Sequence, residues 1–149
     1  MSQRPTKVQR LVRLNQFRED LASGVLRQAI SEQLHAQENH QQATDEIDKL
    51  GQWKARSNSA GGLDLGLYGA VLELEQSAMA CADELRVTML DCEKRADQAQ
   101  SALMGAASAT RASENRGKRE HALAKATQEK RLFDQVSDLL LSNREVRRD

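Results

Sequence analysis

The sequence predicts an all-α protein, folded as a long antiparallel two-helix coiled-coil hairpin with a longer second helix. Strong helix formers abound, whereas aromatic residues make up only 3% of the 149 residues, too few for a thick globular core. Pro5 is the only proline. Four of the eight glycines fall within residues 56–69, RSNSAGGLDLGLYG. The helical sequence therefore has a single concentrated break.

The first helix is expected over about residues 5–56. Its apolar and small residues recur in alternating steps of three and four, which is the heptad seam of a coiled coil. Between Val25 and Gln33 the steps are all of four, a stutter that relaxes the supercoil without breaking the helix. The expected seam consists of Leu11, Leu14, Arg18, Leu21, Val25, Ala29, Gln33, Ala36, His40, Ala43, Ile47 and Leu50.

The break itself is expected to be a loop over about residues 57–64. Ser57 to Gly62 is polar and Gly-rich, and Asp64 is placed to cap a following helix. The alternative is a continuous helix that dimerises in parallel. Two adjacent glycines inside a helix cost about 2 kcal/mol relative to alanine, which favours the hairpin.

The second helix is expected over about residues 65–146, with a seam interrupted by one pair of four-residue steps near Leu85 and Met89. Cys81 and Cys92 are expected to be small seam residues, because a separation of about 16 Å along one helix is too long for a disulfide. The expected seam consists of Val71, Leu74, Ala78, Cys81, Leu85, Met89, Cys92, Ala96, Ala99, Leu103, Ala106 and Thr110, followed less regularly by Leu123, Ala126, Phe133, Val136 and Leu140.

The two helices are unequal, at roughly 75 Å and 120 Å, so the hairpin brings Pro5 opposite a residue near position 118. The remainder of the second helix then projects alone and exposes apolar side chains, which suggests a binding partner. The alternatives are a frayed tail or a fold-back onto the base of the hairpin. The overhanging apolar residues are Leu123, Leu132, Phe133, Val136, Leu139, Leu140 and Leu141.

Charge is segregated along the chain although the formal net charge is zero. Residues 1–20 and 111–131 are rich in arginine and lysine, and the hairpin brings these two stretches together at its base. Acidic residues dominate the positions near the loop. Such asymmetry orients an encounter with charged partners. The alternative, solvated helix faces with pairs within each helix, explains individual charges but not their segregation.

The residues give little reason to expect an enzyme, a cofactor or a metal. Glu32 and His35 form one Glu-x-x-His motif, but a di-iron bundle needs a second such motif and further carboxylates on facing helices. Nucleic-acid binding is not expected, because no aromatic platform accompanies the basic residues. No segment is apolar enough for membrane insertion, and the N-terminus lacks the apolar region of a signal peptide, so a cytoplasmic protein is expected.

The layout resembles the stalk proteins of bacterial type III secretion, which include the flagellar FliJ and the injectisome proteins YscO and HrpO. The resemblance rests on SAGG and LYGAVLELEQSAM around the start of the second helix, and on EKRLFDQVSDLLLSNREVRR near the end. It covers nearly the whole chain. Members of this family usually carry more aromatic residues near the loop than the two found here, Trp53 and Tyr68. This difference favours an injectisome member over a flagellar one.

The resemblance implies that the paired termini insert into a hexameric secretion ATPase, promote its assembly and turnover, and couple it to the export gate at the inner membrane. Some members also bind substrate chaperones. The residues implied in ATPase contact are Arg4, Lys7, Arg10, Arg13, Arg111, Arg116, Arg119, Phe133 and Leu140. Those implied in export-gate contact are Trp53, Leu67, Tyr68, Val71 and Leu72.

The stalk hypothesis implies a monomer in isolation. Its first competitor is a self-assembling coiled-coil scaffold or an escort protein without ATPase contact. Its second is a peripheral binder of membranes or nucleic acid that uses the basic end.

Overall fold

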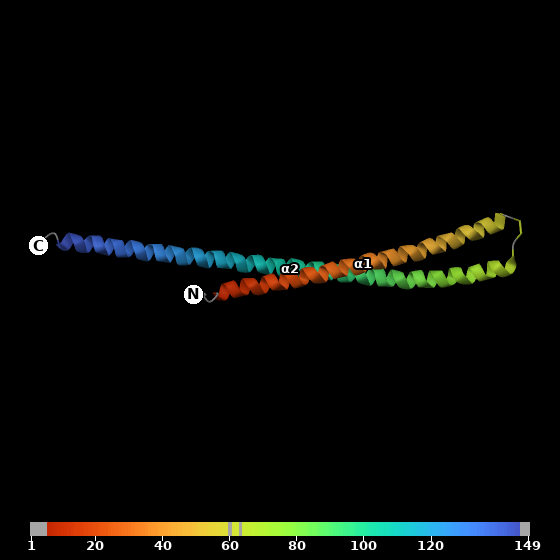
Figure 1. Ribbon diagram of the computed structural model, residues 1–149, viewed down its shortest axis with the longest axis horizontal. Coiled ribbons are helices and arrows are strands. Elements are labelled where there is room, and N and C mark those ends of the chain that lie inside the picture. The colour runs from red at the N-terminus through yellow and green to blue at the C-terminus, as the bar shows by residue number, and fades with distance from the viewer. Residues whose placement is uncertain (1–5, 60, 63, 147–149) are drawn as a thin grey trace. The chain divides into compact units, whose positions relative to one another are not determined.

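The computed structural model describes residues 6–59, 61–62 and 64–146, with the side chains of residues 144–146 excepted. Helix α1 spans Lys7–Ser59 and helix α2 spans Leu65–Val146. They form an antiparallel hairpin whose second helix is the longer, which confirms the predicted fold class (Figure 1). Helix α1 continues past Arg56, so the loop is shorter than expected.

Two compact units make up the chain, and each is described by itself. Unit 1 consists of Met1–Glu19 and Gly105–Asp149, and unit 2 consists of Asp20–Met104. Each unit therefore contains a part of α1 and a part of α2.

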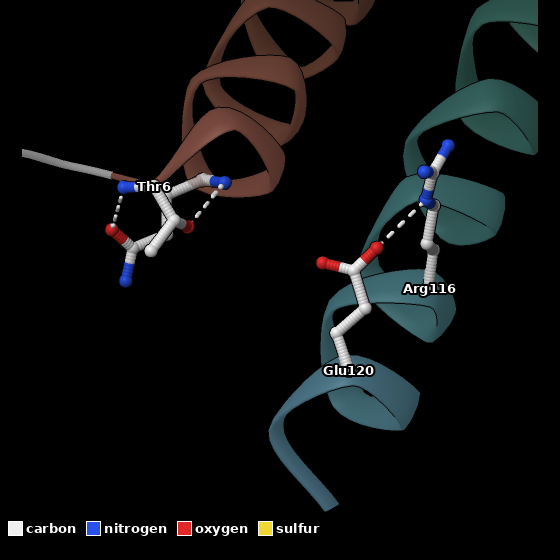
Figure 2. Close-up of polar contacts among 4 residues, drawn as sticks. Thr6, Arg116 and Glu120 are labelled. Carbon is white, nitrogen blue, oxygen red and sulfur yellow. Dashed lines mark hydrogen bonds and ion pairs between the residues drawn. The ribbon is translucent and has the colours of Figure 1, made fainter. Parts of the chain in front are cut away.

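Helix α1 begins with a capping box at Thr6 and Gln9. The backbone N–H of Thr6 donates to the Gln9 side-chain oxygen at 2.9 Å, and the backbone N–H of Gln9 donates to the Thr6 hydroxyl at 3.2 Å (Figure 2). These two bonds satisfy donors that have no partner inside the helix, which fixes where it starts. Pro5, the expected start, lies outside the described residues.

The loop between the helices depends on one glycine and one aspartate. Gly61 has a φ of 73°, in the left-handed region that only glycine adopts without strain. Asp64 caps α2, because its carboxylate accepts the backbone N–H of Gly66 at 3.0 Å and that of Leu67 at 3.3 Å. The cap predicted from the sequence is therefore confirmed.

In unit 2 the seam between the helices is made of small residues. Ala29, Ala96 and Ala99 form its buried cluster, and Leu26 packs against them. Small side chains let the two backbones approach closely. The buried apolar residues of this unit are Ala29, Ala36, Ala43, Val71, Ala82, Cys92, Ala96 and Ala99.

The seam expected for the first part of α1 is wrong. Leu11, Leu14, Arg18, Leu21 and Val25 are exposed, whereas Asn15, between Leu14 and Arg18, is buried. The buried and half-buried positions instead keep a strict heptad without a stutter: Val8, Val12, Asn15, Glu19, Ala22, Leu26 and Ala29. The seam therefore lies on another face of the helix, and the leucines face outward.

Seven positions of the expected α2 seam are also wrong, because all of them are exposed: Leu74 and Cys81 in unit 2, and Leu123, Ala126, Phe133, Val136 and Leu140 in unit 1. In unit 2, Glu75 is half-buried and Ala82 is buried instead. From Leu85 onward the expected seam positions are buried or half-buried as far as Thr110. The observed positions alternate between steps of four and three throughout, so the pair of four-residue steps does not exist.

The seam of unit 1 is polar. Asn15, Thr110 and Ser113 are buried there, and the Asn15 amide donates to the carbonyl of Ala109 at 3.3 Å. A side chain at Gly117 would place its Cβ 3.2 Å from Val8 of α1, so the helices lie close at that point too. One buried asparagine in a coiled-coil seam specifies the pairing register at some cost in stability.

Replacing Ala96 by leucine should destabilise unit 2, because the added side chain has no room between the helices. We expect Ala96→Leu to lower the free energy of unfolding by about 1–3 kcal/mol, measured by urea denaturation followed by circular dichroism. Ala102, exposed on the same helix, is the matched control. Ala102→Leu should change stability by less than about 0.5 kcal/mol. Equal effects at the two positions would contradict the small-residue seam.

Candidate interaction surfaces

An apolar groove lies between α1 and α2 in unit 2, on the loop side of the unit. It encloses about 760 Å³ and is lined mostly by apolar atoms. Helix α1 contributes Glu46, Lys49, Leu50 and Trp53, and helix α2 contributes Leu67, Val71, Leu74, Ser77, Ala78 and Cys81. We call this the tip groove.

Three of the five residues expected to contact an export gate line the tip groove together: Trp53, Leu67 and Val71. Tyr68 is half-buried and Leu72 is exposed, and neither lines the groove. Sequence reasoning missed Leu74 as a surface residue because it was assigned to the seam. Its seven-residue spacing from both Leu67 and Cys81 is the signal that could have found it.

An ion pair joins the two helices beside the tip groove. The Lys54 ammonium binds the Glu75 carboxylate, and both side chains are largely buried. Breaking such a pair leaves a buried charge without a partner, so the pair fixes the register of the helices beside the groove.

The basic residues expected at the base lie in unit 1. Lys7, Arg10, Arg13, Arg111, Arg116 and Arg119 are all exposed, and Arg4 lies outside the described residues. Arg116 donates to Glu120 of the same helix at 3.0 Å (Figure 2). Exposed pairs of this kind contribute about 1 kcal/mol or less, so Arg116 can exchange its partner at little cost.

A second groove, of about 880 Å³, lies in unit 1 between the start of α1 and the facing part of α2. Its charged and titratable lining residues are Arg13, Lys118, Glu120 and His121. Arg13 and Lys118 line the same groove, although Lys118 was not among the residues expected to contact an ATPase. This surface can hold an anionic group more readily than a cationic one.

The last part of α2 is largely exposed within unit 1, and beyond Ala124 none of its described residues lines the groove beside α1. From Lys118 to Asn143 every residue is exposed except Ser137, which is half-exposed. Phe133 is 72% exposed and Leu140 63%. We call residues 118–143 the tail. Its apolar side chains are available to a partner and contribute little to the fold of the chain itself.

Glu32 and His35 of the Glu-x-x-His motif each lie near a charged side chain. Glu32 forms an ion pair with Arg95 at 3.5 Å, and His35 lies 3.8 Å from Glu38 on the exposed face of α1. Within the described ranges no group of three or more histidine, cysteine, aspartate or glutamate residues could hold a metal ion.

Comparison with known protein families, curated proteins and solved structures finds no match to this chain. The resemblance to secretion stalks therefore stays a prediction from the sequence. None of the described helices has a stretch long and apolar enough to cross a membrane.

Because the tail is largely exposed in unit 1, polar substitutions there should not affect stability. We expect Phe133→Ser combined with Leu140→Ser to change the free energy of unfolding by less than about 0.5 kcal/mol. Leu85, half-buried in the seam of unit 2, is the matched control. Leu85→Ser should cost about 2 kcal/mol or more. Urea denaturation measures both, and a large loss in the tail variant would indicate that the tail packs against the chain.

Proposed function

We propose that the chain is the central stalk of a bacterial type III secretion system. In this function unit 1 inserts into the hexameric secretion ATPase and promotes its assembly and activity, and unit 2 is presented to the export gate. The observation that carries the proposal is the tail, a largely exposed helical segment that combines basic and apolar side chains. A hairpin that served only as a folded spacer has no need of such a segment.

The chemistry of unit 1 supports contact with an anionic protein surface. Between Lys7 and Arg18 there are four basic residues and no acidic one, and none of the four forms an ion pair within the described residues. Unpaired arginines bind carboxylates strongly when a partner excludes water. Such ionic contacts bury little apolar surface, and the apolar side chains of the tail would add buried apolar area to the same interface.

The chemistry of unit 2 supports a different partner. One of its concave surfaces, the tip groove, is mostly apolar, and in residues 45–84, which contain the groove, aspartate and glutamate outnumber lysine and arginine. A stalk needs two unlike surfaces because it contacts two unlike partners. In the proposed function, unit 1 offers the basic surface and unit 2 offers the apolar tip groove.

One observation favours the scaffold as a second candidate. Leu11, Leu14 and Phe17 are exposed on α1 in unit 1 and could pair with a second copy. Light scattering separates the two functions, since a monomer at all concentrations is expected for the stalk and a stable parallel dimer for the scaffold.

The stalk function predicts that the protein raises ATP hydrolysis by its cognate secretion ATPase and promotes hexamers. Reversing Arg111, Arg116 and Arg119 to glutamate should abolish both effects. Charge-assisted contacts contribute about 1.5–3 kcal/mol each, so we expect affinity for the ATPase to fall by at least about a hundredfold. Turnover assays and sedimentation measure the two effects.

The matched control reverses three exposed basic residues of unit 2: Arg56, Arg86 and Lys94. This variant has the same net charge and should still stimulate the ATPase. Circular dichroism should show full helicity for both variants. A wild-type protein that stimulates neither turnover nor assembly would exclude the stalk function, and equal loss in both variants would exclude a specific role for unit 1.

A further inference from the structure

The residues of α2 that line the tip groove have the spacing of a helix-packing site. Leu67, Leu74 and Cys81 line it at strict seven-residue intervals and are exposed, whereas Val71 and Ala78 alternate with them. Together these positions follow one another in steps of four, three, four and three. This is the pattern into which the side chains of a neighbouring helix insert.

The length of the groove along α2 matches that of a helix of about four turns. Along α2 its lining runs from Leu67 to Cys81, which corresponds to roughly 21 Å of helix. Across from it, Leu50 and Trp53 of α1 form the other wall. A bulky side chain entering between Trp53 and Leu74 would be covered from both sides.

The charged residues that line the groove are Glu46 and Lys49, one of each sign, whereas the sequence that contains the groove is rich in carboxylates. Between residues 45 and 84 the acidic residues are Asp45, Glu46, Asp48, Asp64, Glu73, Glu75, Asp83 and Glu84, and the basic residues are Lys49, Lys54 and Arg56. Lys54 is already paired with Glu75. The excess of carboxylates attracts a cationic partner and raises its rate of encounter.

We propose that the tip groove binds an amphipathic helix of a partner protein, about four turns long, with leucine-like side chains on one face and lysine or arginine on the other. Helix-in-groove binding of this kind uses anchors at positions i, i+3, i+4 and i+7. The proposal deepens the proposed function, in which this surface faces the export gate. Its test needs no secretion component, so the two can fail separately.

The chain carries its own reporters of groove occupancy. Trp53 is the only tryptophan, and it lines the groove. Cys81 is an exposed thiol in the groove, whereas Cys92 is buried in the seam. Occupancy should therefore shift tryptophan emission and protect one of the two cysteines from alkylation.

The probe is an 18-residue peptide of leucine and lysine, without tryptophan, patterned as an amphipathic helix. Titrated into the full-length protein, it should shift the Trp53 emission to shorter wavelength with saturation, and slow alkylation of Cys81. A leucine and glutamate peptide of the same pattern should bind at least about tenfold more weakly at low salt.

Leu74→Asp tests the site, because Leu74 lines the groove and is 58% exposed, so folding should tolerate the change. The affinity of the Leu74→Asp variant for the leucine and lysine peptide should be at least about tenfold lower than that of the wild-type protein. Leu90→Asp is the matched control, since Leu90 is 52% exposed on α2 and does not line the groove. The affinity of the Leu90→Asp variant for the same peptide should stay within about twofold of wild type. A change of under 1 kcal/mol in binding free energy is typical of a residue outside the contact.

Three results would overturn the proposal. The first is the absence of any change in Trp53 emission or Cys81 alkylation. The second is equal binding by Leu74→Asp and Leu90→Asp, which would mean that the peptide coats the helices without a site. The third is an emission shift on raising the protein concentration alone, which would make a second copy the occupant.

Discussion

The packing of helices through small side chains is the constraint on which the other features of the molecule depend. In unit 2 the buried apolar residues are six alanines, one valine and one cysteine. Each alanine buries little area, so no single contact stabilises the pair strongly, and the seam works only by repetition along both helices. Because mostly small residues are buried in the seam, several bulky apolar residues lie outside it. Leu74 and Leu90 are examples, and side chains of this size on a surface suit contact with other molecules.

The two units differ in what fills their seams, and the difference has an energetic consequence. The buried apolar residues belong to unit 2, whereas the buried residues of unit 1 are the polar Asn15, Thr110 and Ser113. Hydrogen bonds satisfy these groups, yet they contribute less net stability than apolar burial. Local opening follows the amount of apolar burial, so unit 1 should open more readily than unit 2. A segment that opens readily can adapt to a partner without unfolding the whole chain.

The sequence was sufficient to predict the hairpin, the loop and the Asp64 cap, because these depend on local backbone chemistry. Gly61 and the cap act over a few residues, and nothing distant competes with them. The seam of the first helix could not be predicted by apolar size. Leu11 and Leu14 are larger than Asn15, but the strict heptad that continues into Ala29 and Ala36 fixes the face that α1 turns toward α2. The tip groove was only half predicted, because Leu74 was assigned to the seam on the same argument from size.

The position of the tail's apolar residues around α2 indicates what kind of partner can cover them. In unit 1 the seam positions of α2 are Ala106, Thr110, Ser113 and Gly117, and the same spacing continued along the tail falls on mostly polar residues such as Glu120, Thr127, Arg131 and Asp134. Phe133, Val136 and Leu140 lie off that line, and Val136 is about 200° from Asp134, on the opposite side of the helix. A longer first helix that kept the observed pairing would therefore pack against this mostly polar line, on which Leu141 also falls, and would leave Phe133, Val136 and Leu140 exposed. The tail's apolar face is thus separate from the hairpin seam, and only another surface can bury it.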